Sequence, residues 1–156
     1  MTAAELWQEF LDQKQAQGYE VEDFPFYEAF QFGLEAQTID DLARLVKEGI
    51  KTATASAYPM YELEQAPLPQ TGTYSIVMDS EEQAVCLIQT TEVRTVPFNQ
   101  VSEAHAYKEG EGDRSLTYWR RVHEDFFRQE LAQVGLDFSQ DMPVVCEEFR
   151  VVKNSE

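Results

Sequence analysis

Basic residues are scarce in this sequence. Among 156 residues there are 12 Lys and Arg against 29 Asp and Glu, so the formal net charge is −17. Non-specific binding to nucleic acid depends on displacing counterions with Lys and Arg, and an acidic protein repels polyphosphate at long range. The composition therefore excludes extended, non-specific nucleic-acid binding. Any contact with nucleic acid is expected at one local pocket.

Long apolar runs and cysteines are also few. No apolar run approaches the roughly 18 residues that a membrane-spanning helix needs, and the N-terminus MTAAELWQEF lacks the cationic region of a secretory signal. Cys86 and Cys146 both lie within predicted strands, and low cysteine usage is typical of a reducing compartment. We therefore expect a soluble, cytoplasmic protein that does not bind membranes and has no disulfide.

The residues that are present suffice for one buried core, because 43% of the chain is apolar. Apolar residues at helical spacing predict an amphipathic helix over residues 3–17. They are Leu6, Trp7, Phe10 and Leu11. The segment FPFYEAFQFG, at 24–33, then holds five aromatic residues, more apolar surface than a free tail leaves in water. We expect it to pack on the core rather than to stack on nucleobases.

The rest of the sequence predicts an α+β fold. A helix is expected from Thr38, where Asp41 three residues later suggests a capping box, to Gly49. Proline and glycine mark 58–72 as a long loop. Strands are predicted at 73–79, 83–98 and 142–152, and helices at 99–107 and 115–133. This order favours a small β-barrel or a curved, mostly antiparallel sheet with flanking helices.

The stretch VKEGIKTATAS, at 46–56, places a lysine among small and hydroxylated residues. Gly49 has an ordinary explanation, because glycine commonly ends a helix before a strand begins. In a regular strand, however, Lys51 and Thr54 would point to opposite faces, and Thr54 would share its face with Ser56. For Lys51 and Thr54 to meet, the backbone after Gly49 must turn or bulge.

A second unusual stretch, AYKEGEGDRSLTYWRRVH, covers 106–123. Glu109, Glu111 and Asp113 crowd one turn, and Asp113 is placed to cap the helix that follows. Crowded carboxylates raise one another's pKa unless cations answer them. The candidate cations are Lys108, Arg114, Arg120 and Arg121. The stretch matches neither a P-loop nor a dinucleotide fingerprint, and an acidic loop before a capped helix is the alternative explanation.

Together the two stretches resemble the ASCH family of the PUA-like superfamily. Gly49, Lys51 and Thr54 match the family's Gly-x-Lys-x-x-Thr signature, and EGEGDRSLTYWRRVH matches from Glu109 onward. LPQTGTYSIVMD, QTTEVRTVPF and DMPVVCEEFRVV support the resemblance, which covers about 38–153 and is strongest to a bacterial subgroup with an N-terminal tryptophan-bearing helix. It implies an ASCH domain over 37–156 and a helical, aromatic extension over 1–36 that packs on it.

The resemblance also implies a cleft lined by Lys51 and Thr54, with Glu109 approaching from its loop. As an enzyme, the site would use Thr54 as a nucleophile, which needs a base. Lys51 could be that base only with a lowered pKa, and would otherwise be a cation that clamps an oxygen. Glu109 would orient Lys51 or shuttle a proton. Small members characterised as acetylcytidine amidohydrolases have an arginine where this chain has Ser56.

Four further residues are candidate ligand contacts: Ser56, Tyr58, Arg114 and Arg120. Arginine recognises phosphate in a fixed fork, but both arginines could instead pair with neighbouring acids. Trp119 lies at core spacing. His105 and His123 lack partners at zinc-ligand spacing, so we take them for surface or supporting residues and expect neither metal nor cofactor.

These residues predict binding of a nucleoside, a nucleotide or a short single-stranded RNA element. A hydrolase acting on a modified nucleoside, such as an acetylcytidine amidohydrolase, is the enzymatic hypothesis. A non-catalytic RNA-binding regulator and a ribonuclease are the alternatives, and the acidic composition counts against long RNA for both.

Overall fold

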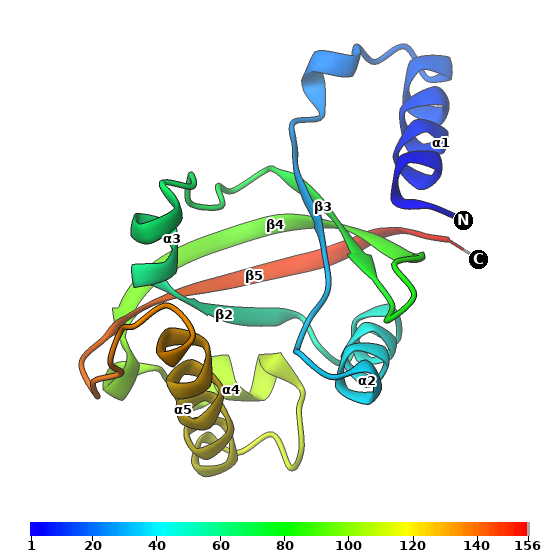
Figure 1. Cartoon of the computed structure of the whole chain (residues 1–156). Helices are drawn as coiled ribbons and strands as arrows, with labels where there is room; N and C mark the ends of the chain where they lie inside the picture. The colour runs from blue at the N-terminus through cyan, green and yellow to red at the C-terminus, as the bar shows by residue number, and fades with distance from the viewer. Residues whose placement is uncertain (156) are drawn as a thin grey trace.

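The computed structural model describes residues 1–155, in which five helices and five strands follow one another in mixed order (Figure 1). The α-helices are α1 (Ala3–Ala16), α2 (Ala36–Lys47), α3 (Tyr58–Glu64), α4 (Glu103–Glu109) and α5 (Leu116–Ala132). The strands are β1 (Phe26–Phe30), β2 (Ala53–Ala57), β3 (Tyr74–Met78), β4 (Ala84–Pro97) and β5 (Pro143–Asn154). Two short 3-10 helices cover Val21–Asp23 and Phe98–Gln100.

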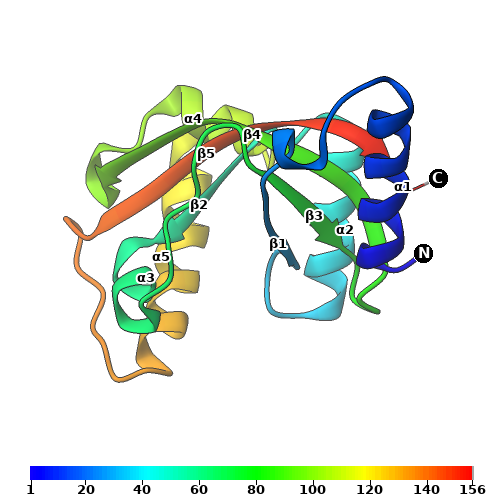
Figure 2. The same cartoon turned by 90° about the horizontal axis from the view of Figure 1, so that it is seen from above.

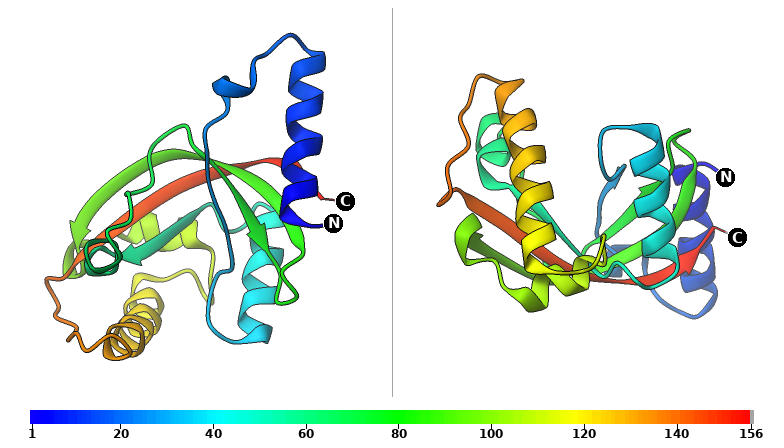
Figure 3. Two further views of the ribbon diagram at one scale, coloured as in Figure 1. Left: turned by 45° about the horizontal axis from the view of Figure 1, so that its top comes forward. Right: turned by 90° about the horizontal axis from the view of Figure 1, so that it is seen from below.

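All five strands belong to one curved sheet with the order β1-β3-β4-β5-β2. Only β1 and β3 are parallel, and the other three pairs are antiparallel. The long strands β4 and β5 bend together like an arch (Figure 3), and their pairing contains two register shifts, which increase twist. The predicted α+β fold with a curved, mostly antiparallel sheet is confirmed. The sheet is not a closed barrel, because β1 and β2 remain its edges.

The helices gather at the two ends of this sheet. Seen from above, α3 and α5 lie at one end and α1 and α2 at the other, with β1 between the two groups (Figure 2). At one end α1 packs on β3 and β4 through Leu6, Phe10 and Leu11. On the opposite face α2 packs through Ala43 and Val46 against a cluster that includes Ile88 and Phe149.

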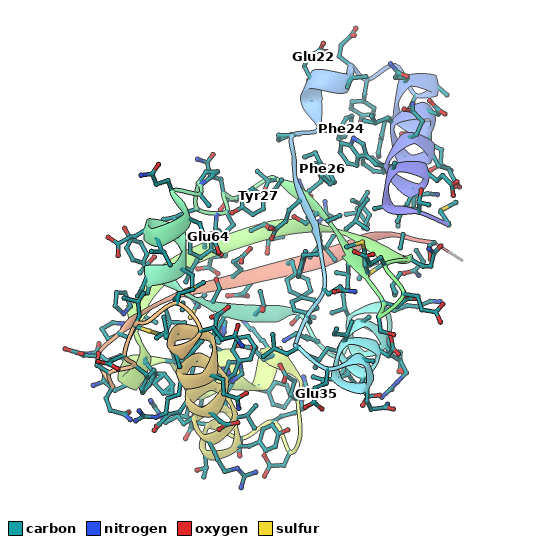
Figure 4. All side chains as sticks on the ribbon, in the orientation of Figure 1. Glu22, Phe24, Phe26, Tyr27, Glu35 and Glu64 are labelled. Carbon is teal, nitrogen blue, oxygen red and sulfur yellow. The ribbon has the colours of Figure 1, made fainter. Side chains whose placement is uncertain are left out.

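The aromatic segment after α1 is packed, and part of it is an edge strand. Phe24 makes edge-to-face contacts with Phe10 and Tyr74, with ring centroids 5.3 and 5.7 Å apart. The ring centroids of Phe26 and Trp7 lie 4.9 Å apart, whereas the hydroxyl of Tyr27 donates to the Pro67 carbonyl. The labelled side chains show Phe24 and Phe26 on the α1 side of the segment and Tyr27 toward α3 (Figure 4).

One predicted helix start and one predicted capping residue differ from the structure. The start of α2 is Ala36, with Glu35 in the N-cap position, so Thr38 lies inside the first turn. Asp113 accepts a hydrogen bond from the Ser115 amide, and Ser115 itself caps α5 by accepting from Tyr118. At α5 the Ser115 hydroxyl thus takes the capping role predicted for Asp113, whereas the N-cap residue of α2 makes no side-chain capping bond.

The predicted loop at 58–72 and the predicted helix at 99–107 also differ from the structure. Tyr58–Glu64 is the helix α3, which Pro59 favours because its fixed φ and missing N–H suit a first turn. Asn99 lies in a 3-10 turn, and α4 begins only at Glu103 after the N-cap Ser102. Both cysteines are buried and unpaired. Within residues 1–155 no helix combines the length and the apolar character that crossing a membrane requires.

Candidate functional site

The backbone turns between α2 and β2, and this turn brings Lys51 beside the strand. Gly49 adopts φ 79°, and the amides of Ile50 and Lys51 both donate to the Leu45 carbonyl at the end of α2. The Thr52 amide donates to the Lys108 carbonyl at 2.7 Å, which ties the turn to α4. Regular strand geometry begins only at Ala53. The alternation of faces therefore does not extend back to Lys51, and both Lys51 and Thr54 line the same cleft.

Gly110 brings the second motif against this turn. It follows α4 with φ 73°, a conformation that glycine adopts without strain. A Cβ atom at this position would lie 2.5 Å from the Ile50 carbonyl oxygen, so no other residue fits without moving backbone. The contact places Glu109 and Glu111, on either side of Gly110, around Lys51.

Lys51 is buried and remains charged. Its ammonium Nζ lies 3.1 Å from Glu109 Oε1 and 2.8 Å from Glu111 Oε2, and only 1% of the residue is exposed. The centroid of the Phe32 ring lies 5.1 Å from Lys51 Nζ. Burial on its own lowers the pKa of Lys51, but the two carboxylates outweigh it and raise the pKa above its ordinary value.

The carboxylate of Glu109 is held by four donor groups. Oε1 lies near Lys51 Nζ and 3.3 Å from His123 Nε2. Oε2 lies 2.8 Å from His105 Nε2 and accepts from Trp119 Nε1 at 2.6 Å. Burial acts to raise the pKa of Glu109, but the charges of Lys51 and His123 and the hydrogen bonds hold it well below its usual range. Glu109 is therefore an anion whose lone pairs are occupied.

The two histidines beside Glu109 differ in the partners of their ring nitrogens. His123 Nδ1 lies 2.9 Å from the Trp119 carbonyl and Nε2 faces Glu109, so both ring nitrogens face acceptors. Burial lowers the pKa of His123, but Glu109 outweighs it and raises the pKa. Nδ1 of His105 has no hydrogen-bond partner. A hydrogen on Nδ1 would be an unsatisfied buried donor, so Nε2 is the ring nitrogen placed to donate to Glu109.

A cleft of about 240 Å³ is lined by residues of α2, α3, α5 and all five strands. Its charged residues are mostly acidic: Glu28, Glu109, Glu111, Glu130 and Glu147 face Lys51 and His123. Its hydroxyl groups belong to Thr38, Thr54, Ser56, Tyr61, Ser75 and Thr90. Its apolar wall includes Phe30, Phe32, Leu42, Ile88, Val122, Phe126 and Phe149. Such a cavity offers many polar contacts and little attraction for a polyanion.

The structure brings four of the seven predicted site residues into this cleft: Lys51, Thr54, Ser56 and Glu109. Ser56 Oγ lies 2.8 Å from the Tyr61 hydroxyl. Their chemical roles stay predictions.

Tyr58, Arg114 and Arg120 are not among the residues that line the cleft. The guanidinium of Arg114 lies 3.6 Å from the centre of the Tyr107 ring and donates to the Tyr107 carbonyl. Arg120 donates to the carbonyls of Phe98, Asn99 and Val101. Both arginines thus satisfy backbone carbonyls of the connections around α4, so neither guanidinium is directed at a ligand in the cleft.

Sequence reasoning missed several residues of the site. Of the two expectations for His105 and His123, surface or supporting residue, the second holds, because each is less than a tenth exposed and faces Glu109. Their spacing held a signal: His105 and Glu109 are four residues apart on α4, as are Trp119 and His123 on α5. Glu147 had no local signal, because its partners are distant in the sequence.

Three side chains of the cleft carry ligand atoms of the kind that bind metal ions. Ligand atoms of Glu109, Glu111 and His123 lie within 4.8 Å of one another. The ammonium of Lys51 contacts the same two carboxylates and neutralises part of their charge.

The fold agrees with the comparisons to known proteins. The sequence model of the ASCH domain matches residues 28–153, so the chain belongs to the ASCH domain family and has its PUA-like fold. No curated protein matches the chain. The match begins inside β1, and the predicted division into 1–36 and 37–156 stays a prediction.

Two solved structures are similar along nearly the whole chain. One is an ASCH domain from Lactobacillus crispatus JV V101, with 30% identity, a TM-score of 0.84 and 95% of each chain covered. The other is a protein from Enterococcus faecalis V583, with 38% identity and a TM-score of 0.84, covering 95% of this chain and 86% of that one.

Proposed function

We propose that this ASCH domain binds a single modified nucleoside, free or at an accessible position in a short RNA, and hydrolyses an amide on its base, as in acetylcytidine. The observation that carries the proposal is the buried, charged Lys51, held between Glu109 and Glu111 in the same cleft as the Thr54 hydroxyl. A buried cation costs desolvation energy unless it is paired, and Lys51 is both paired and among the residues that line the cleft.

In this reaction Lys51 acts as a cation and not as a base. A lysine has three N–H donors, and two of them serve Glu109 and Glu111. The third is free for the amide oxygen, where negative charge develops when Thr54 attacks the carbonyl carbon. Glu109 orients Lys51, because its four donor contacts and low pKa leave it no part in proton transfer.

The size and charge of the cleft favour a nucleoside over a strand. Its volume of about 240 Å³ lies below the roughly 300–1,000 Å³ of sites for drug-sized ligands, which favours a single nucleoside over a longer strand. Five carboxylates against Lys51 and His123 repel a phosphodiester. The same balance disfavours a ribonuclease.

The test is hydrolysis of N4-acetylcytidine and a panel of other acylated nucleosides, followed by chromatography of the deacylated product. We expect turnover by the wild type and by Lys108→Ala, which removes a lysine outside the cleft. Thr54→Ala should abolish turnover but leave affinity within about tenfold, since one neutral hydrogen bond contributes roughly 0.5–1.5 kcal/mol. Binding without hydrolysis of any member would contradict the enzymatic proposal and leave a binding module, whose affinity Lys51→Ala should then impair most.

A further inference from the structure

The proposed function leaves one chemical role unfilled. Thr54 needs a base to take its proton, and neither Lys51 nor Glu109 can act as that base. Lys51 keeps its own proton because two carboxylates raise its pKa. Glu109 already accepts from four donors and has a pKa well below its usual range. Another group in the cleft must therefore accept the proton.

Glu147 is the carboxylate that the sheet places beside Thr54. In the antiparallel pair of β2 and β5, Thr54 lies directly opposite Glu147. Directly opposite residues project from the same face, with Cβ atoms about 4.5–5.5 Å apart. Both residues line the cleft. Glu147 is thus the cross-strand neighbour of the proposed nucleophile.

The surroundings of Glu147 suit a group that exchanges protons. Burial is the main cause that raises its pKa to about 7, the charge of Glu28 on β1 adds to it, and a hydrogen bond with Thr90 on β4 opposes it. Tyr27 on β1 and Tyr61 on α3 are close enough for its charge to affect their own pKa values. A carboxyl with a pKa near neutrality exists in both forms at pH 7, as general acid–base catalysis requires.

We propose that Glu147 is the general base and general acid of this cleft, an inference that rests on the proposed function. Its carboxylate takes the proton as Thr54 Oγ1 bonds to the acyl carbon, and the carbonyl π electrons move to the oxygen near Lys51. Collapse of this intermediate breaks the C–N bond, and Glu147 gives its proton to the leaving nitrogen. Water then attacks the acyl-threonine and loses a proton to Glu147, which returns it to Thr54 Oγ1 as the ester C–O bond breaks.

The first test compares Glu147→Gln with Glu148→Gln on N4-acetylcytidine across pH 5.5–8.5. Glu148 is the next residue on β5, points to the other face and pairs with Lys108 outside the cleft. We expect Glu147→Gln to have a kcat about 10²–10⁴-fold below that of the wild type and a rate that no longer rises with pH. Glu148→Gln should keep the wild-type kcat and the rise of the rate with pH. Glu147→Asp retains a carboxyl and should keep the rise at a lower rate. Near wild-type kcat in Glu147→Gln would refute this role but leave the proposed function standing.

A second test does not depend on nucleoside recognition. p-Nitrophenyl acetate can acylate an activated hydroxyl without needing an acid for its leaving group, and mass spectrometry locates the acetyl group. We expect acetylation of Thr54 whose rate rises with pH near 7 in the wild type and in Glu148→Gln, and slow acetylation in Glu147→Gln. If no nucleoside is hydrolysed but this pattern appears, the proposed function fails and the role of Glu147 stands. Equal acetylation in all three proteins, or none on Thr54, would overturn that role.

Discussion

At the scale of residues, the cluster around Glu109 decides the charge state of the site. Two cations, Lys51 and His123, lie against two anions, Glu109 and Glu111, so the buried group is electrically balanced. Balance of this kind allows a protein to bury charges whose individual desolvation is costly. It also means that removing one member affects all the others.

Glu109→Gln should therefore destabilise the protein strongly. The substitution keeps the shape but leaves a buried Lys51 with one carboxylate fewer, and breaking a buried pair costs about 3–5 kcal/mol. Urea unfolding at pH 7 measures the change. Glu111→Gln is the matched control and should cost less, because 17% of the Glu111 side chain is exposed.

The same cluster predicts how stability depends on pH. The folded-state pKa of Glu109 is depressed, so its contribution is present above the unfolded value of about 4.3 and is lost as pH falls below it. The gap in stability between wild type and Glu109→Gln should consequently shrink as the pH of the urea titration falls from 5 to 3. A gap that stays constant over this range would show that Glu109 is not the charged partner of Lys51.

At the scale of elements, the contact between α4 and the turn after α2 assembles the site. Gly110 is the point of contact, and its missing side chain allows the approach to Ile50. Strand register is equally important elsewhere in the cleft, where the pairing of β2 with β5 places Glu147 opposite Thr54. Both arrangements join segments more than 50 residues apart.

Gly110→Ala should separate the two motifs. The left-handed conformation alone costs an alanine about 1–2 kcal/mol, and the clash with the Ile50 carbonyl adds to this cost. Gly135→Ala is the control, because Gly135 has φ 75° but open space around a Cβ atom. We expect Gly110→Ala to lose more unfolding free energy than Gly135→Ala and to lose hydrolysis as well. Equal losses of stability would mean that the Ile50 contact does not constrain the turn.

At the scale of the whole molecule, the net charge of −17 limits how RNA can be held. The described surface has few cations to meet phosphates. One group lies away from the cleft, in a groove between α1 and β5 that includes Lys14, Arg150 and Lys153.

Binding of a short single-stranded RNA that carries acetylcytidine should hence depend only weakly on salt. Two or three phosphate contacts correspond to a slope of roughly −1.4 to −2.1 in a plot of log affinity against log salt. Fluorescence anisotropy with the Thr54→Ala protein gives this slope without turnover. A slope typical of six or more contacts would contradict a local site, and its loss on replacing Lys14, Arg150 and Lys153 would identify the groove as the missed surface.

The sequence by itself determined the class of fold and most strand positions, which follow from local patterns of periodicity and composition. Lys51, Thr54 and Glu109 were singled out by the resemblance to the ASCH family, and their roles stay predictions. Helix boundaries were less well predicted, because residues such as Asp113 and Ser115 compete for the same cap and only their final geometry decides between them.

The tertiary structure alone decided the chemistry of the site. Whether Lys51 is a base or a cation depends on Glu109 and Glu111 lying against its ammonium, some 60 residues further along the chain. The residue beside Thr54 depends on strand register, and the direction of Arg114 and Arg120 on which carbonyls are left unpaired nearby. Protonation and reactivity are set by burial and by neighbours in space, and the order of residues does not specify those until the chain has folded.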